Sequence, residues 1–128
     1  MTNNPKHWTG GTIFCDLDGT LFKHGTHDLL PGAKELLSLF AEFKMRVILV
    51  TRRGDVEFKG HPVYSKDATL DALMDHALEL YEVIYDVRSP RILVDDNDIE
   101  CLQGKTDAGF MAQDLASVRE WLDEYAAA

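Results

Sequence analysis

Short apolar runs that alternate with helical segments constrain the fold of this chain more than any other feature of its sequence. The runs rich in β-favouring residues are 12–15, 45–50, 82–87 and 91–96, with a fifth short strand expected near 109–112. Apolar residues at helical spacing predict helices over 33–43, over 66–81 and around 115–125. Strands that are apolar throughout are typical of a sheet buried on both faces. The expected fold class is therefore α/β: a single Rossmann-like domain with a mostly parallel sheet and helices on both faces.

The length of 128 residues fits one domain, which we expect over 11–128, after a flexible N-terminal segment, 1–10. The net charge of −9 disfavours indiscriminate nucleic-acid binding, because an acidic chain gains nothing from counterion release. No segment has the apolar length of a signal peptide or a membrane span. Cys15 and Cys101 form no CxxC pair or secretory framework, so a reducing, cytoplasmic location is expected, without membrane partners.

Polar side chains end three of the predicted strands. Asp16 and Asp18 follow the first strand in CDLD, Thr51 and Arg52 follow the second in LVTRR, and the pair 95–96 ends the fourth in LVDDND. The carboxyl ends of parallel strands meet at one edge of a sheet, where ligands of such folds bind. We therefore expect these side chains to converge on one site.

The chemistry of this set favours a metal and a phosphate. Four carboxylates in a small space repel one another unless a cation lies between them, and an all-oxygen ligand set favours Mg²⁺. The Thr51 hydroxyl and the Arg52 guanidinium are suited to binding phosphate oxygens, Arg52 bidentately. A carboxylate can also attack phosphorus to form an aspartyl phosphate, while a second acid moves the proton.

The segments FCDLDGTLF, ILVTRR and ILVDDND, taken in this order, resemble the haloacid dehalogenase-like superfamily of phosphohydrolases over residues 12–112. The resemblance implies that Asp16 is the nucleophile, Asp18 the general acid/base and Thr51 a ligand of the phosphoryl group. It also implies that Asp95 and Asp96 complete the Mg²⁺ site, with Asp96 the favoured direct ligand and the Asp18 carbonyl a further one. Gly19 and Thr20 match the tight turn beside the nucleophile, where glycine suits unusual backbone angles and close approach to phosphate.

The family also places a cation between the hydroxyl and the acid pair, and here the sequence offers alternatives. Arg88 is favoured because the RSPR segment resembles the Lys-Pro segment of short family members; Lys66, at the start of the second helix, is the other candidate, and Arg91 is a weaker one. The 35 positions from Asp16 to Thr51 and the 44 from Thr51 to Asp95 leave no room for a cap domain. The loop 22–30 is a candidate flap over an open site.

The expected function is a Mg²⁺-dependent phosphomonoesterase that acts through an aspartyl phosphate on a small phosphorylated metabolite such as a sugar phosphate. Alternatives are a phosphatase of nucleic-acid ends or phosphoproteins, a phosphoryl-transfer or phosphonate enzyme on the same scaffold, and a non-catalytic binding domain of this fold. For Arg52 and Arg53, a solvated surface position is an interpretation of equal weight to a role in the site. Loop histidines such as His24 are more often surface residues than substrate ligands. The substrate and the oligomeric state stay open.

Overall fold

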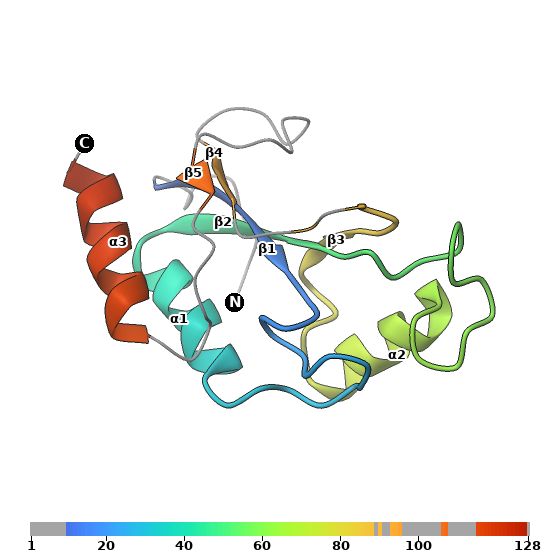
Figure 1. The fold of residues 1–128 in the computed structure, drawn as a ribbon. Helices are drawn as coiled ribbons and strands as arrows, with labels where there is room; N and C mark the ends of the chain where they lie inside the picture. Colours follow the sequence, from blue (N-terminus) through green and yellow to red (C-terminus); the bar gives the residue numbers. More distant parts are fainter. Residues whose placement is uncertain (1–9, 89, 91–92, 96–105, 108–114, 128) are drawn as a thin grey trace.

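The computed structural model describes residues 10–88, 90, 93–95, 106–107 and 115–127. Their order is β1 (Gly11–Asp16), α1 (Ala33–Glu42), β2 (Met45–Val50), α2 (Lys66–Asp75), β3 (Glu82–Ile84), β4 (Leu93–Asp95), β5 (Thr106–Asp107) and α3 (Leu115–Ala127) (Figure 1). This is a small α/β fold, compatible with a Rossmann-like domain. The predicted segments 1–10 and 109–112 lie wholly or almost wholly outside the described residues.

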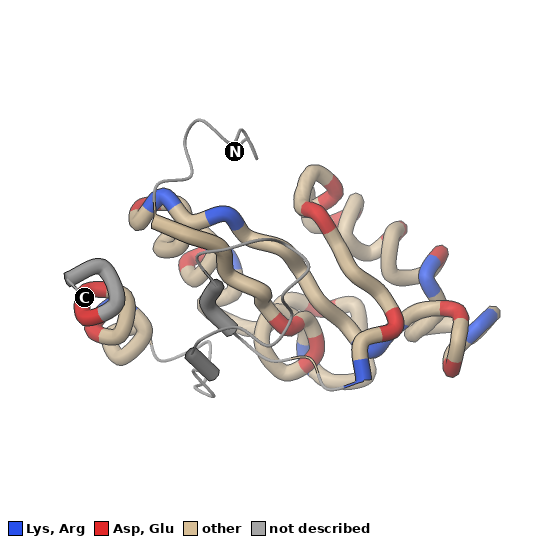
Figure 2. The backbone as a smooth tube through the Cα atoms, turned by 90° about the horizontal axis from the view of Figure 1, so that it is seen from above, with Lys and Arg blue, Asp and Glu red and all other residues tan. Residues whose placement is uncertain are grey.

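The strands form one sheet in the order β3-β2-β1-β4-β5. β1 and β2 are parallel, with Asp16 opposite Val50, and β2 and β3 are parallel, with Val50 opposite Ile84. The carboxyl ends of these three strands therefore lie at the same edge. The parallel pairing of β1 and β2 brings the strand ends at Asp16 and Thr51 together, as expected. Figure 2 shows charged residues on the helices and in the loops as well as at strand ends.

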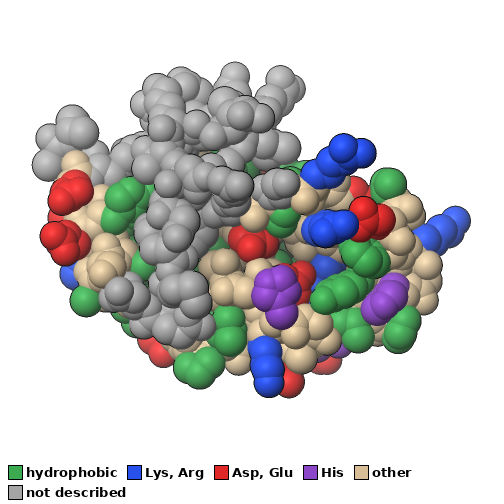
Figure 3. Space-filling view, viewed as in Figure 1, with side chains coloured by type: hydrophobic (Ala, Val, Ile, Leu, Met, Phe, Trp, Pro, Cys, Tyr) green, Lys and Arg blue, Asp and Glu red, His purple; other side chains and the backbone are tan. Residues whose placement is uncertain are grey.

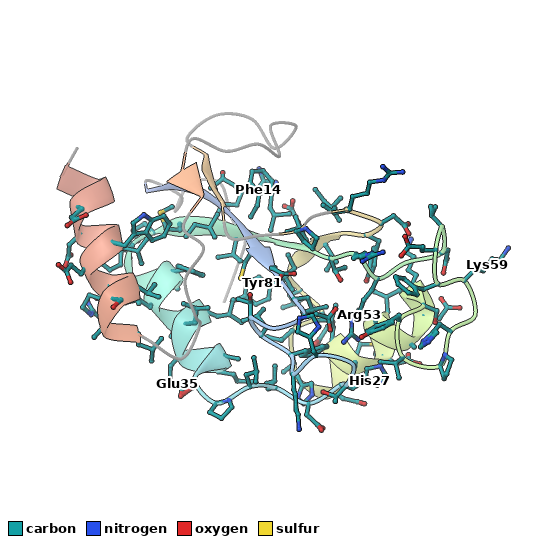
Figure 4. The ribbon with its side chains drawn as sticks, in the orientation of Figure 1. Phe14, His27, Glu35, Arg53, Lys59 and Tyr81 are labelled. Atoms are coloured by element: carbon teal, nitrogen blue, oxygen red, sulfur yellow. The ribbon has the colours of Figure 1, made fainter. Side chains whose placement is uncertain are left out.

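The three described helices lie on one face of the sheet, which corrects the expectation of helices on both faces (Figure 1). The chain steps in one direction from β1 through β2 to β3, and right-handed crossovers then place α1 and α2 on the same side. Alternate strand residues such as Ile13 and Val47 pack with the helices, whereas Phe14 and Ile48 belong to a second cluster. Phe14 points away from the helices in Figure 4.

The fourth strand runs opposite to the expected direction. β4 pairs with β1 in antiparallel register, so Thr12 lies opposite Asp95. The link from Ile84 to Leu93 has eight residues, and a parallel strand needs a crossover of about a dozen or more. β4 therefore starts near the carboxyl edge where β3 ends, and the sheet is mixed: three parallel strands with β4 and β5 antiparallel.

Helix α2 is shorter than predicted, and a different set of its side chains is buried. It ends at Asp75, and the left-handed backbone of Ala77 (φ 60°) turns the chain so that the Leu78 N–H bonds to Leu73 O. Leu70 and Met74, expected in the core, are 39% and 61% exposed. The buried side chains of the helix are Thr69, Ala72 and Leu73. None of the helices in the described ranges has the length and apolar composition needed to cross a membrane.

Candidate active site

Asp16 is the last residue of β1, and the following turn holds its carboxylate in place. Its Oδ1 accepts a hydrogen bond of 2.7 Å from the Leu17 N–H, and the Thr20 side chain hydrogen-bonds the same carboxylate. Burial raises the pKa of Asp16 to about 7; the Leu17 bond opposes this, the nearby Asp18 charge adds to it and the Thr20 bond opposes it. An ionised Asp16 is therefore destabilised until a cation approaches it.

The turn after Asp16 depends on glycine. Gly19 has φ +82°, a left-handed conformation, and a Cβ at this position would lie 2.9 Å from His24 Nε2. The Gly19 N–H donates to Phe22 O at 2.7 Å, and the Leu21 and Phe22 N–H groups donate to Leu17 O. Gly19 thus shapes the turn, and the buried Thr20 supports the Asp16 carboxylate.

Asp18 is held by Arg53, for which a solvated surface position and a place in the site were equally weighted interpretations. Arg53 Nε donates to Asp18 Oδ2 at 2.9 Å, and Nη2 donates to Asp18 Oδ1 at 2.6 Å. The Arg53 side chain is 1% exposed and points inward toward the site in Figure 4. A buried charge of this kind is stable only when it is paired and hydrogen-bonded. Arg53 is therefore part of the site.

The surroundings of Arg53 complete its hydrogen bonding. Nη2 also donates to Thr26 O at 2.6 Å, and Nη1 donates to Val63 O at 3.3 Å. Its Cζ lies 5.1 Å from the ring centroid of Phe22 and 5.1 Å from that of Tyr64, and these two rings belong to different loops. Val63 and Tyr64 belong to the same loop as Arg53, whereas its other partners, Asp18, Phe22 and Thr26, are far from it in sequence, so no local pattern marks Arg53.

Thr51 follows β2 at the carboxyl edge, as expected, but its side chain is fully buried. Its hydroxyl oxygen accepts the Arg53 N–H at 3.0 Å, while its backbone N–H donates to Ile84 O and its carbonyl accepts the Val87 N–H. Thr51 is not among the described residues that line the cavity. In this structure it orders the backbone that carries Arg53.

Arg52 lies at the cavity, but its bidentate edge is already occupied. Nε and Nη2 donate to the two Glu57 carboxylate oxygens at 3.0 and 3.1 Å. The expectation that Arg52 grips phosphate bidentately therefore needs this ion pair to break. The guanidinium Cζ also lies 5.9 Å from the Phe58 ring centroid. The Arg52 guanidinium is thus paired with Glu57 along one edge and lies beside the Phe58 ring.

The two candidate cations occupy different places. Arg88, on the link after β3, lines the cavity together with Asp16 and Asp18. The Lys66 ammonium instead lies 5.4 Å from the Tyr85 ring centroid, and Lys66 is not among the described residues that line the cavity. Arg88 thus lies at the cavity, and its role as the catalytic cation stays a prediction. Arg91 lies outside the described residues.

The second acid pair does not join the site in the described structure. The backbone of Asp95 lies opposite Thr12, at the other end of β1 from Asp16 and about 13 Å away along the strand. The expectation that Asp95 and Asp16 share an edge fails because β4 is antiparallel. Asp96 lies outside the described residues. Within the described ranges no group of three or more His, Cys, Asp or Glu side chains is placed to hold a metal.

The Asp16 carboxylate is still suited to bind a Mg²⁺ ion that has few protein ligands. Mg²⁺ is commonly bound through one or two carboxylates and keeps several waters and substrate oxygens as its other ligands. The Asp16 carboxylate is a hard oxygen donor, and burial is the main reason that its pKa is raised. The Asp18 side chain is less suited, because Arg53 already bonds to both of its oxygens.

A cavity of about 390 Å³ opens over these side chains. The described residues that line it are Asp16, Asp18, His24, Arg52, Arg53, Phe58, Tyr64, Arg88 and Pro90. On the face shown in Figure 3, acidic side chains lie beside a histidine, with hydrophobic and basic side chains next to them. The floor carries the carboxylates, and the segment 52–64 supplies most of one wall.

The candidate flap, 22–30, is tied down on several sides. The His27 ring Nε2 lies 3.0 Å from Val63 O, and the His76 ring Nε2 lies 2.6 Å from His27 O. Both contacts join a ring nitrogen to a carbonyl, so in each case the nitrogen is the donor. The loop is thus attached to α2 and to the segment 52–64, and it forms a fixed border of the site in this structure.

Comparison with protein-family models, curated proteins and solved structures finds no match for this chain.

Proposed function

We propose that this chain is a phosphohydrolase of the haloacid dehalogenase-like type that cleaves phosphomonoesters through an aspartyl phosphate on Asp16. The observation that carries the proposal is the placement of Asp16 and Asp18 together on the floor of a cavity that Arg53 and Arg88 also line. The carboxylates can take part in covalent and proton-transfer chemistry, and the arginines favour an anionic substrate.

The proposed reaction has two steps. In the first, which starts with Asp18 in its protonated form, an Asp16 carboxylate oxygen attacks phosphorus, the bond from phosphorus to the substrate oxygen breaks, and that oxygen takes the Asp18 proton and leaves as an alcohol. In the second, water attacks phosphorus, Asp18 takes a proton from that water, and the bond to Asp16 breaks to release phosphate. Each carboxylate oxygen has two lone pairs, so Asp18 has acceptor capacity beyond its bonds to Arg53.

The residues of the chain prepare both steps. The Leu17 N–H fixes Oδ1 of Asp16, which orients the carboxylate as a nucleophile. Arg53 keeps Asp18 beside it, and Arg88 offers a positive charge to the phosphoryl group. A Mg²⁺ ion held by Asp16 and the Asp18 carbonyl would supply the charge neutralisation that lets a carboxylate approach a phosphate dianion.

Turnover of p-nitrophenyl phosphate, with Mg²⁺ and with chelator, tests the proposal. We expect Mg²⁺-dependent release of phosphate, and a loss of at least about a thousandfold in kcat for Asp16→Asn, which removes the nucleophile and retains the shape. Acid quenching with a ³²P-labelled substrate should label the wild-type protein and leave Asp16→Asn unlabelled. Absence of turnover together with measurable phosphate binding would overturn the enzyme in favour of a binding domain.

A further inference from the structure

The cavity is larger than a phosphoryl group needs, and part of its lining is aromatic. A volume of about 390 Å³ falls in the range of pockets that hold whole small molecules. Beyond the carboxylates, Phe58 and Tyr64 line the cavity from the loop after β2, and Pro90 lines it from the link after β3. A leaving group bound here would meet aromatic and guanidinium surfaces.

Arg52 offers its face to a ligand because its edge is occupied. The Glu57 carboxylate accepts from Nε and Nη2, and the Arg52 Cζ lies over the Phe58 ring, 5.9 Å from its centroid. A guanidinium plane and an aromatic ring are the two surfaces on which nucleobases stack in proteins. Tyr64 is less available for stacking: His61 stacks on it at 5.1 Å, and Arg53 also lies over its ring at 5.1 Å.

Charge and size decide between a free nucleotide and a polymer. Three arginines line the cavity, two of them paired with Glu57 or Asp18, although the whole chain has a net charge of −9. The positive charge is therefore local, which suits a small anion, whereas a nucleic-acid strand would also meet the acidic surroundings.

We infer that the cavity recognises a nucleoside monophosphate, with the base against the wall formed by Arg52 and Phe58 and the phosphoryl group toward Asp16. This inference rests on the proposed function and narrows its substrate class. A sugar phosphate without a base would leave that wall unused.

The test compares substrates that differ in the base. We expect kcat/KM for the faster of adenosine 5′- and 3′-monophosphate to exceed that for ribose 5-phosphate by about tenfold or more, as base stacking of ordinary strength predicts. Arg52→Lys keeps the charge and loses the plane, and Phe58→Leu keeps apolar volume and loses the ring. Each should reduce this ratio at least about threefold.

Lys59→Ala is the matched control, because Lys59 is exposed in the same loop and projects away from the site in Figure 4. It should leave the ratio unchanged. Calorimetric binding of adenosine 5′-monophosphate and ribose 5-phosphate to Asp16→Asn separates recognition from catalysis, and we expect the nucleotide to bind more tightly.

Three outcomes would overturn the inference. Equal kcat/KM for the nucleotides and ribose 5-phosphate would refute base recognition and leave the phosphohydrolase intact. A ratio that Arg52→Lys and Phe58→Leu both leave unchanged would refute this wall as the base site. Faster hydrolysis of a phosphorylated oligonucleotide end than of either mononucleotide would assign the cavity to nucleic-acid ends. Absence of turnover with every substrate refutes the proposed function, while the binding measurement still decides whether the base is recognised.

Discussion

Arg53 and Asp18, 35 residues apart in sequence, are joined by two hydrogen bonds of 2.6 and 2.9 Å within the protein interior. The first comes from the loop after β2 and the second from the turn after β1. The pair therefore joins the two segments that form the floor and the wall of the site.

Removing Arg53 should be costly for stability. Arg53→Ala leaves Asp18 as a largely buried carboxylate without its partner, and breaking a buried pair in this way costs about 3–5 kcal/mol. Arg52→Ala is the control, because its pair with Glu57 is exposed and such pairs contribute about 1 kcal/mol or less. Urea unfolding of both variants measures the difference. Equal losses in the free energy of unfolding would contradict the structural role of Arg53.

The raised pKa of Asp16 predicts a pH dependence of stability in the metal-free protein. With a pKa of about 7 in the folded protein and an ordinary value of 3.8 in the unfolded chain, folded Asp16 keeps a proton between about pH 4 and pH 7 that the unfolded chain has released. The free energy of unfolding should therefore fall as the pH rises through this window and level off above it.

Asp16→Asn isolates this effect, because it removes the titrating group and leaves the other ionisable residues in place. Thermal or urea unfolding in chelator from pH 4 to pH 8 should show a downward slope for the wild type relative to Asp16→Asn. A difference between the two proteins that does not change with pH would show that the Asp16 pKa is not raised.

If the proposed Mg²⁺ site is present, Mg²⁺ should stabilise the folded protein, because the ionised Asp16 of the native state would hold the ion and the unfolded chain has no equivalent site. We expect Mg²⁺ to raise Tm more at pH 8 than at pH 5, where Asp16 is protonated and cannot act as a ligand. Differential scanning fluorimetry against Mg²⁺ concentration measures this. An equal rise in Asp16→Asn would place the ion elsewhere.

The positions of the two candidate cations predict unequal effects on catalysis. Arg88→Ala should reduce kcat/KM at least about tenfold more than Lys66→Ala, since Arg88 lines the cavity and the Lys66 ammonium lies against Tyr85. Steady-state kinetics with a phosphomonoester decides this. A large loss of kcat/KM in Lys66→Ala together with a small loss in Arg88→Ala would make the lysine at the start of α2 the catalytic cation.

The parts of the fold that could be predicted from sequence are those fixed by local pattern. The apolar run 45–50 is β2, and the helix expected over 33–43 is α1, because burial and periodicity are both visible in short segments. The direction of β4 could not be predicted from its composition, since parallel and antiparallel strands share it. The short link before β4 carried that information instead.

The residues of the site also differ in whether local sequence could predict them. Asp16 and Asp18 stand out because two carboxylates directly after a buried strand are unusual, whereas Arg53 has nothing unusual in its neighbourhood. Its burial depends on Asp18, Phe22 and Thr26, which the fold brings to it from another segment. Tertiary partners of this kind have no signature in the local sequence.

The separate origins of floor and wall have a consequence for how such a protein can diversify. Asp16 ends β1 and Asp18 lies in the turn that follows it, whereas Arg52, Glu57 and Phe58 all belong to one continuous loop. That loop is anchored near its start, where the Val56 N–H bonds to Asp86, and near its end, where Gly54 N–H bonds to Tyr64 O. If the proposed function holds, exchange of residues 57–62 between these anchors would change the choice of leaving group without touching the carboxylates, so that one scaffold would be open to many substrates through a single short insertion or replacement.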